Sequence, residues 1–432
     1  MPVRPLHRFP VPPGPDGVLR LFDALPEALA GHGPALAPLP TASLLTPHDV
    51  VQNLIRATRP DDPDAPLEGD EVAIVLATSG STGSPRGVLH TASSLRALDQ
   101  QVLQIARSDD PAVRVQWIAA LPVTSMGGFN VLIRALATDQ IPRCVPGIGG
   151  LAPFTVEGFA ATVELAAEGG TALATSLVAA QVRRLLGEPR GCAALRACAL
   201  VLVGGGPLPS AVAAAAQDAG ITLTTTYGAT ETGGGCVFNG QPLAGVQIGF
   251  LQSDGRLATP TADADSDQVT GEIVVKGPMI ALGYRCDAQG TAQAFTTQGY
   301  RTGDIGRWTS AQLLQVQGRA DDVIAVRGTN VALGAVEAVI GGLTAVAAVA
   351  AIPSGPIDDP TITICVVLAD GAAGQSGEAE IEALIRAQVL EHLGSAANPA
   401  RILVTEQLPM LPGGKIDRVR LRREVIENGP AR

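Results

Sequence analysis

The stretch Thr78-Ser-Gly-Ser-Thr-Gly-Ser-Pro-Arg-Gly87 follows an apolar run, Val72 to Leu76, that is typical of a buried strand. Its glycines allow positive φ angles, so consecutive backbone N–H groups can converge on an anion. The guanidinium of Arg86 adds a permanent positive charge, and hydroxyl donors come from Thr78, Ser79, Ser81 and Thr82. The Gly-Lys-Ser/Thr of a Walker A loop is absent. The stretch predicts a cradle for a polyphosphate, and the alternative is an exposed Gly/Ser turn.

The composition is that of a globular protein with two or three domains. The chain has 432 residues, of which 46% are hydrophobic and 3% are aromatic. Its net charge of −11 argues against a nucleic-acid partner held by a broad basic surface. The charge does not exclude ATP, because distant surface charges are screened over about 8 Å while local donors act on the phosphates.

Cysteine and histidine spacing indicates a reducing compartment without a protein-bound zinc. The six cysteines have no C-x-x-C spacing and the five histidines are scattered. The proline-rich start of the chain lacks the apolar core of a signal peptide. No apolar run reaches the ~18–20 residues that span a bilayer. We therefore expect a cytoplasmic protein with no membrane partner.

Strand-like and helix-like runs alternate between Val72 and about Thr226, which predicts a mostly parallel α/β layer structure. The first 70 residues are rich in Pro and Ala, with one expected helix at Val18–Leu29. Further on, we expect strands at Val113–Ala120, Cys198–Val203 and Ile221–Thr225, and helices at Gly127–Ala137, Val156–Ala167, Leu177–Leu186 and Ser210–Ala219. A small β subdomain and an α+β module follow, with expected segments at Gly271–Lys276, Leu313–Gln317, Asp322–Val326, Val331–Gly341, Ala345–Ile352, Thr361–Leu368, Ala379–Leu393 and Arg401–Thr405.

Two short stretches in the middle of the chain suit a nucleotide. In Tyr227-Gly-Ala-Thr-Glu231, the ring can lie against adenine, Thr230 can donate to the α-phosphate and Glu231 can hold Mg²⁺. In Tyr300-Arg-Thr-Gly-Asp304, a carboxylate fixed by a tight glycine turn can accept both ribose hydroxyls. The alternatives are a strand-end turn with a solvated glutamate and an ordinary polar loop.

Three more stretches are each weak signals by themselves. In Gly318-Arg-Ala-Asp-Asp322, Arg319 can reach ribose or phosphate and Asp321 can be a pivot between domains. Lys415 follows two glycines, so it can be presented to a distant site. Gly205, in a glycine run after a strand, lets the backbone approach a ligand. The alternatives are a surface salt-bridge turn, a solvated lysine and a glycine-rich turn that binds no ligand.

Taken in order, the motifs T-S-G-S-T-G-S-P-R-G, Y-G-A-T-E, G-Y-R-T-G-D, G-R-A-D-D and P-G-G-K-I-D resemble those of the adenylate-forming superfamily. The resemblance implies an α/β fold with an N-terminal adenylation domain at 1–320 and a small mobile C-terminal domain at 321–432. It also implies a two-step reaction: a carboxylate attacks the α-phosphate of Mg·ATP, and a thiol, usually that of coenzyme A, then displaces AMP.

The same resemblance implies a role for each motif residue. Lys415 would bridge the carboxylate and the α-phosphate, and rotation about Asp321 would replace it with Arg327 and Gly328 beside the CoA thiol. Glu231 would be the metal ligand, and Thr230 and Arg86 would act on the phosphates. The remaining ATP-binding residues would be Thr78, Ser79, Gly80, Ser81, Thr82, Gly83, Gly205, Tyr227, Gly228, Asp304 and Arg319.

A closer resemblance is to the short form of o-succinylbenzoate–CoA ligase, an enzyme of menaquinone synthesis. It rests on the early phosphate stretch, on Leu202–Gly206 and on the run from Thr226 to Gly245. It implies a substrate pocket formed by Ser125, Gly128, Thr175, Ser176, Gln181, Gly233, Gly234, Gly235 and Val237.

The departures from that branch lie mainly on the substrate side, with one mild change in the phosphate stretch. A His-His-x-x-Gly stretch is replaced by Val123-Thr-Ser-Met-Gly-Gly128, Ala179 stands in place of a proline, and Arg86 in place of the commoner lysine. These changes leave open a different aryl or acyl acid, or transfer to a carrier protein. A non-catalytic nucleotide-binding protein is the alternative of another class, although such a protein needs neither Glu231 nor Lys415. A homodimer is also left open.

Overall fold

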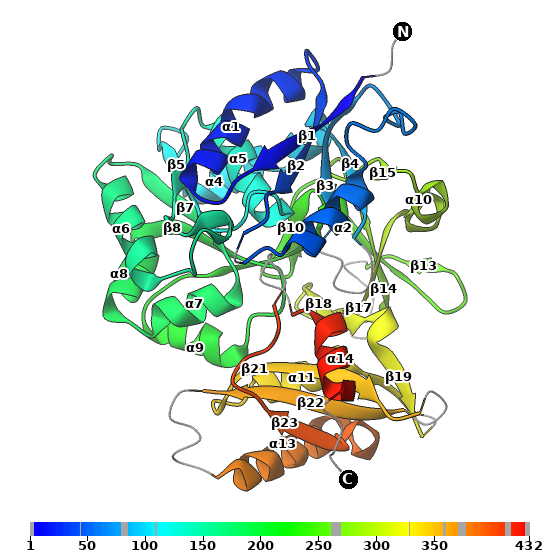
Figure 1. The fold of residues 1–432 in the computed structure, drawn as a ribbon. Helices are drawn as coiled ribbons and strands as arrows, with labels where there is room; N and C mark the ends of the chain where they lie inside the picture. Colours follow the sequence, from blue (N-terminus) through cyan, green and yellow to red (C-terminus); the bar gives the residue numbers. More distant parts are fainter. Residues whose placement is uncertain are drawn as a thin grey trace.

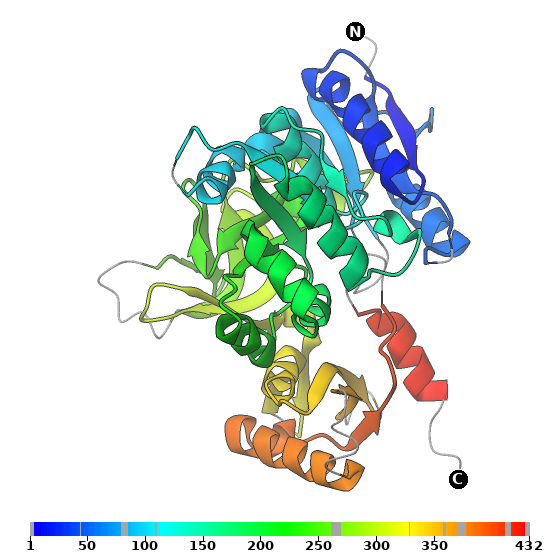
Figure 2. The same cartoon turned by 90° about the vertical axis from the view of Figure 1, so that its left-hand side faces the viewer.

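The computed structural model describes residues 4–43, 45–78, 85–108, 110–260, 269–327, 329–356, 360–369, 377–410 and 416–427. Three sheets and their helices form a large upper body, and the elements after β18 form a smaller body below it (Figure 1). A quarter turn shows the same division, with the orange and red C-terminal elements below the rest (Figure 2). The α/β class predicted from the sequence is confirmed.

The first sheet brings two distant parts of the chain together. Its strand order is β1 (Leu6–Val11), β2 (Ala35–Pro40), β3 (Val72–Ala77), β4 (Gly87–Thr91) and β15 (Gly283–Tyr284). The first three strands are parallel, and β3, β4 and β15 pair antiparallel. Helices α1 (Pro15–Ala30) and α2 (His48–Thr58) connect the early strands. Because Tyr284 pairs with Val88, the sheet places Tyr284 beside the exit of the phosphate stretch.

The second sheet is the parallel layer that the sequence predicts. Strands β6 (Arg143–Cys144), β5 (Val115–Ala119), β7 (Ala172–Leu177), β8 (Cys198–Val203) and β9 (Thr224–Ala229) run parallel, and β10 (Gly234–Phe238) and β11 (Gln241–Pro242) complete the sheet antiparallel. Cores on its two faces hold residues of α3 (Ala92–Arg96), α4 (Asp99–Ala106) and α5 (Met126–Ala137), and of α6 (Val156–Ala167), α7 (Ala179–Leu186), α8 (Pro189–Ala197) and α9 (Ser210–Asp218). Apolar residues cover both faces, as expected for a parallel sheet.

The third sheet is antiparallel and lies at the edge of the upper body. It consists of β13 (Leu257–Ala258), β12 (Gln247–Leu251), β14 (Thr270–Lys276), β17 (Gly299–Trp308) and β16 (Phe295–Thr296), with β18 (Leu314–Arg319) paired to β17. Helix α10 (Ala288–Ala294) precedes β16. The register of β17 and β18 places Asp304 opposite Arg319.

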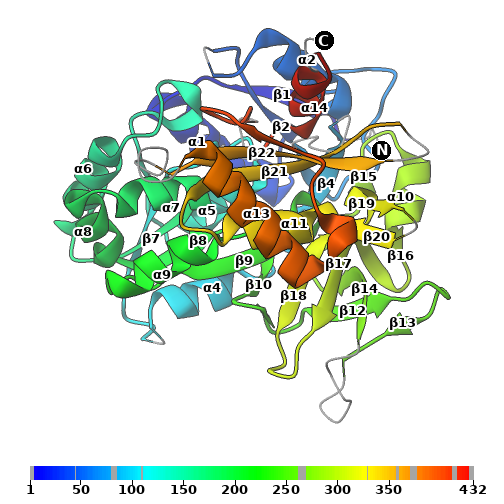
Figure 3. The same ribbon diagram turned by 90° about the horizontal axis from the view of Figure 1, so that it is seen from below.

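The C-terminal elements have cores of their own. A hairpin of β19 (Val323–Val326) and β20 (Thr329–Ala332) leads to α11 (Leu333–Gly341). A second sheet follows, of β21 (Val346–Ser354), β22 (Thr361–Leu368) and β23 (Arg401–Val404). Helix α13 (Glu378–Leu393) packs on this sheet and crosses it in the view from below (Figure 3), and α14 (Arg418–Glu427) ends the described chain. Apolar residues of these elements form two clusters without residues of the upper body.

Three predicted elements, Cys198–Val203, Val156–Ala167 and Thr361–Leu368, have the bounds that the structure shows. Several predicted elements begin at other residues, and two of these differences concern the surroundings of the site. The strand expected from Ile221 begins at Thr224 and continues to Ala229, so Tyr227 lies inside it and not after it. The helix expected from Leu177 begins at Ala179, because Leu177 ends a buried strand.

Candidate active site

Tyr227, Asp304 and Arg319 come together from three strands. The Tyr227 hydroxyl donates to Asp304 Oδ2 at 2.8 Å, and Arg319 Nη1 lies 3.5 Å from Asp304 Oδ1. Burial and the nearby Asp304 carboxylate raise the pKa of Tyr227, so this hydroxyl keeps its proton. Asp304 lies within β17 rather than on a separate turn, which corrects the sequence-based expectation, although Gly303 before it has a φ of 71°. The group fixes the Asp304 carboxylate, which the sequence predicts to bind ribose.

A second tyrosine holds the predicted metal ligand. Glu231, in the 3₁₀ turn Thr230–Thr232, is 8% exposed and accepts a hydrogen bond from the Tyr284 hydroxyl at 2.9 Å. Burial and the Glu231 charge raise the pKa of Tyr284 to about 12. The guanidinium of Arg86 lies 4.8 Å from the centre of the Tyr284 ring, and 3.9 Å from a carboxylate oxygen of Asp287. The structure thus brings Glu231 and Arg86 to the same tyrosine.

The phosphate stretch is closed at its two ends. Thr78 N donates to Arg86 O at 2.8 Å, and Arg86 N donates to Thr78 Oγ1 at 2.9 Å. The stretch therefore leaves and re-enters the sheet at neighbouring points, beside Tyr284. The predicted residues Ser79, Gly80, Ser81, Thr82 and Gly83 lie outside the described residues.

Glycines of β9 and β10 form a closely packed wall. A Cβ atom on Gly228 would lie 1.9 Å from Gly234 O, and a Cβ atom on Gly234 would lie 2.3 Å from Asn130 Nδ2. Gly233 and Gly234 have φ angles of 61° and 97°, and Asn130 Nδ2 donates to Gly233 O at 2.8 Å. At these positions glycine is required both by the backbone angles and by the close approach of neighbouring backbone and side-chain atoms.

Three of the four polar side chains predicted for the acid pocket bond to nearby backbone. Ser125 Oγ donates to Pro122 O at 2.7 Å, and the buried Thr175 Oγ1 donates to Ile118 O at 3.0 Å. Gln181 accepts from Val178 N and donates to Ala120 O. These three side chains hold loops and strands in place, and so the recognition of an acid must depend on other groups as well.

Four other residues predicted for the site lie in four different structural settings. Gly128 lies in the first turn of α5, where a Cβ atom would be 2.3 Å from Pro122 O. Ser176 is buried on β7, and Val237, 1% exposed, packs in a core cluster of the third sheet. Gly205 follows β8 with a φ of 83°.

The C-terminal candidates are only partly described. Asp321 lies in the 3₁₀ turn Ala320–Asp322, and Arg327 is exposed with a φ of 49°. Gly328 and Lys415 lie outside the described residues. Contacts among the described residues that join the lower body to the upper one include a hydrogen bond from Arg183 Nη1 to Ala347 O and the close approach of Gly318 to Gly334, where a Cβ atom on Gly318 would lie 3.5 Å from Gly334 Cα.

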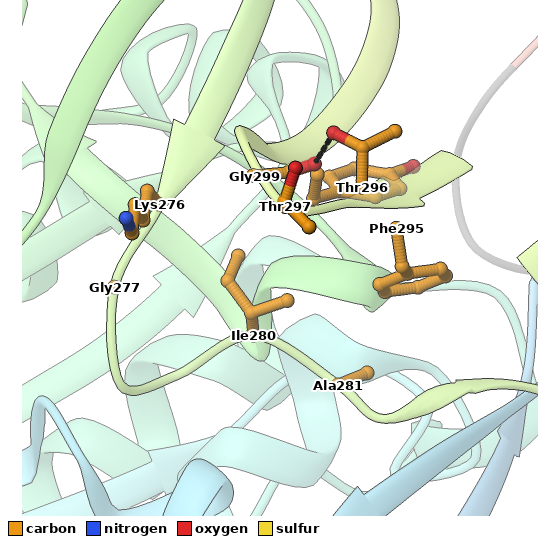
Figure 4. A pocket seen from close by; sticks show the side chains of 9 residues that line it. Lys276, Gly277, Ile280, Ala281, Phe295, Thr296, Thr297 and Gly299 are labelled. Carbon is orange, nitrogen blue, oxygen red and sulfur yellow. Dashed lines mark hydrogen bonds between the residues drawn. The ribbon is translucent and has the colours of Figure 1, made fainter. Parts of the chain in front are cut away.

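A cavity of about 210 Å³, lined in part by Tyr300, lies between the end of β14 and the β16–β17 hairpin. Ile280, Ala281 and Phe295 give it an apolar floor, and Lys276 and Thr297 lie at its edge (Figure 4). Ala281 N donates to Glu231 O at 2.9 Å, so the cavity is separated from the Glu231 turn by one strand of backbone. It contains none of the site residues predicted from the sequence.

Sequence reasoning missed Tyr284. The chain has only three tyrosines, Tyr227, Tyr284 and Tyr300, and all of them gather here. Phe295 lies between two of them, with ring centres 5.2 Å from Tyr284 and 5.0 Å from Tyr300. The rarity of tyrosine was the signal that could have found the third one, because two of the three already lay in the motifs.

Comparisons with known proteins identify the family of this chain. The family model of AMP-binding enzymes matches residues 34–285. A probable 2-succinylbenzoate–CoA ligase of Mycobacterium tuberculosis (strain ATCC 25618 / H37Rv) is 33% identical over 427 residues, covering 98% of this chain and 98% of that protein.

Solved structures share the fold. The o-succinylbenzoate CoA synthetase MenE of Bacillus subtilis, in complex with the acyl-adenylate intermediate OSB-AMP, superimposes with a TM-score of 0.70 at 20% identity, over 97% of this chain and 88% of that one. ATP-bound MatB from Rhodopseudomonas palustris gives a TM-score of 0.78 at 20% identity, over 98% and 89%. Within the described residues, no helix combines the length and the apolar composition that a membrane span requires. The resemblance found in the motifs is confirmed, and the chain belongs to the family of AMP-binding enzymes.

Proposed function

We propose that this protein is an AMP-forming acid–CoA ligase, which adenylates an aryl or acyl acid with Mg·ATP and transfers the acyl group to coenzyme A. The observation that carries the proposal is the pair of tyrosine–carboxylate contacts, Tyr227 with Asp304 and Tyr284 with Glu231, on either side of one site. Each tyrosine fixes one carboxylate. The likeness over the full length to a probable CoA ligase supports the same reaction class.

The residues present fit a magnesium ion carried with the nucleotide. Oε1 of Glu231 accepts the hydrogen bond from the Tyr284 hydroxyl, and Oε2 accepts no hydrogen bond from the described residues. Mg²⁺ is usually held by one or two carboxylates together with substrate phosphates. In the described residues, no group of three or more His, Cys, Asp or Glu side chains forms a complete cage. Glu231 would thus share the ion with the phosphates, where the ion neutralises developing charge.

The first candidate acid is 2-succinylbenzoate, the acid in the names of several relatives. A different aryl or acyl acid is the second candidate. It is favoured by the substrate wall, because Val123–Gly128 supplies no imidazole and Ser125 bonds to Pro122 O. On the nucleotide side, the change to Arg86 keeps the positive charge.

We further propose that residues 1–320 and 321–432 act as two units that pivot near Asp321. Separate apolar clusters in the C-terminal elements support this division. Lys415 would serve adenylation, and Arg327 and Gly328 would lie on the CoA side after rotation. A carrier protein in place of CoA, a homodimer and a cytoplasmic location stay predictions.

Acid-dependent release of pyrophosphate tests the proposal. The purified protein is incubated with Mg·ATP and a panel of aromatic and aliphatic acids, and positive acids are then tested for thioester formation with free CoA and with a phosphopantetheinyl carrier protein. Thioester with CoA is the expected product. Tight ATP binding without pyrophosphate release from any acid would instead support the non-catalytic alternative, and a thioester found only on the carrier would change the acceptor.

A further inference from the structure

A small enclosed pocket lies on the helical side of the glycine wall. Its volume is about 10 Å³, close to the minimum that holds one water-sized group. Helices α3, α4 and α5 surround it with Ser94, Asp99, Asn130 and Arg134 among its lining residues. Gly233 and Gly235, two residues predicted to form the acid pocket, also line it.

The pocket contains an incompletely bonded ion pair. Asp99 is 6% exposed and Arg134 is 5% exposed, yet Arg134 Nε and Asp99 Oδ1 are 3.9 Å apart, too far for a hydrogen bond. Arg134 Nε and Asp99 Oδ2 find no hydrogen-bond partner in the described structure. Burial raises the pKa of Asp99 to about 6 despite the nearby charges of Arg134 and Arg96. A buried donor and a buried acceptor therefore face one small space without a partner.

Unpaired buried charges are costly, so a group that completes their hydrogen bonds is favoured. The missing group has to accept from Arg134 and donate to Asp99. A hydroxyl does both. A carboxylate cannot donate, and its attraction to Arg134 would be offset by repulsion from Asp99 at a similar distance.

The pocket shares Gly233 and Gly235 with the acid pocket predicted from the sequence. Asn130 Nδ2 holds Gly233 O at 2.8 Å, so the wall and the ion pair are fixed by the same helix, α5. Three of the polar side chains predicted for the acid pocket are bonded to backbone, whereas Arg134 Nε and Asp99 Oδ2 are buried without a hydrogen bond in the described structure, so these two atoms can recognise a substituent. We infer that this pocket receives a hydroxyl group of the acid, and that Asp99 and Arg134 determine specificity for a hydroxylated acid. The inference rests on the proposed ligase function.

Pairs of acids that differ by one group test this inference. Pyrophosphate release is measured with benzoate against 2-, 3- and 4-hydroxybenzoate, and with 4-oxo-4-phenylbutanoate against 2-succinylbenzoate, which adds a carboxylate. We expect one hydroxylated acid to exceed its parent at least 20-fold in kcat/KM. The double variant Asp99→Leu/Arg134→Met, which removes both charges together, should reduce that preference to less than threefold. The exposed Arg190→Met is the control and should keep the preference.

The single variant Asp99→Asn tests whether the preference between a hydroxyl and a carboxylate can be reversed. It leaves Arg134 without a counter-charge, so the preference should move from the hydroxyl to the carboxylate of 2-succinylbenzoate. Equal losses for parent and hydroxylated acid in the double variant would mean that the pocket holds only a water molecule. A wild type that prefers 2-succinylbenzoate and no hydroxylated acid would also overturn the inference.

Failure of the proposed function is a separate result, because then no acid releases pyrophosphate. Calorimetric binding of the same hydroxybenzoates and benzoate to the wild type and the double variant tests the pocket without turnover. Equal affinities for parent and hydroxylated acids, or no binding of either, would overturn the hydroxyl subsite in that case.

Discussion

Two tyrosine-to-phenylalanine variants should separate the metal function of the site from its nucleotide function. Tyr284→Phe removes the hydroxyl that donates to Glu231 at 2.9 Å, and keeps the ring that contacts Phe295 and Arg86. A hydrogen bond to a charged group contributes about 1.5–3 kcal/mol. That corresponds to a factor of about 10–150, similar to the loss of metal affinity when a ligand loses its supporting contact.

Tyr227→Phe is the matched variant, since it removes a hydroxyl 2.8 Å from the other carboxylate, Asp304. Both variants are assayed by ATP–pyrophosphate exchange, titrated first with Mg²⁺ and then with ATP. For Tyr284→Phe we expect at least a tenfold higher Mg²⁺ requirement, with activity largely restored at saturating Mg²⁺. For Tyr227→Phe we expect a similar rise in the KM for ATP at an unchanged Mg²⁺ requirement.

The comparison refutes the assignment if both variants shift the same parameter, or if Tyr284→Phe leaves the Mg²⁺ titration unchanged. Thermal unfolding of both variants checks that packing is intact. Because both rings stay buried, we expect each melting temperature to fall by only a few degrees.

Three further predictions concern single residues. His90 is buried with both ring nitrogens unpartnered in the described structure, and burial lowers its pKa to about 3. Below pH ~6.5 the unfolded chain therefore binds a proton that the native state does not, so the free energy of unfolding falls as the pH falls from 6.5 to 3. In urea unfolding at pH 4.5, His90→Phe should remove about 3 kcal/mol of this loss. Lys415→Ala should slow adenylation about a thousandfold, the effect of losing a charge pair of about 4 kcal/mol, while thioester formation from supplied acyl-adenylate continues; equal losses in both half-reactions would contradict domain alternation. Gly228→Ala places a Cβ atom 1.9 Å from Gly234 O and should lower the melting temperature and raise the KM for ATP, whereas Gly206→Ala, with nothing within 4 Å, should change stability by less than about 0.5 kcal/mol.

Elements whose signal is local were predictable from the sequence. Strand β8 and helix α6 have the expected bounds, because uninterrupted apolar or amphipathic runs define them. Strand β2 was missed because it contains Pro38 and Pro40, which argue against a strand. In the structure, Pro38 and Pro40 lie opposite Phe9 and Val11 of β1, while β2 pairs with β3 at Leu36 alone, so no β3 residue is paired with either proline.

The site shows a similar limit, set by long-range pairing. Tyr227, Glu231 and Asp304 could be proposed because each lies in a short motif. The contact of Tyr284 with Glu231 depends on the pairing of β15 with β4, two strands that lie far apart in the sequence. The Asp99–Arg134 pair likewise depends on how α4 packs on α5, and no local pattern marks either residue.

Composition gives an independent reason to place Lys415 in the chemistry. Of the 30 lysine and arginine residues, only Lys276 and Lys415 are lysines. A chain that otherwise uses arginine for positive charge retains lysine where the two are not interchangeable: lysine is a compact charge on a flexible stem, and arginine a planar fork. The proposed bridge between a carboxylate and the α-phosphate suits a compact charge that can move between the two groups. Lys415→Arg should therefore keep the charge but lose most of the adenylation rate, and full activity in that variant would reduce Lys415 to a general electrostatic role.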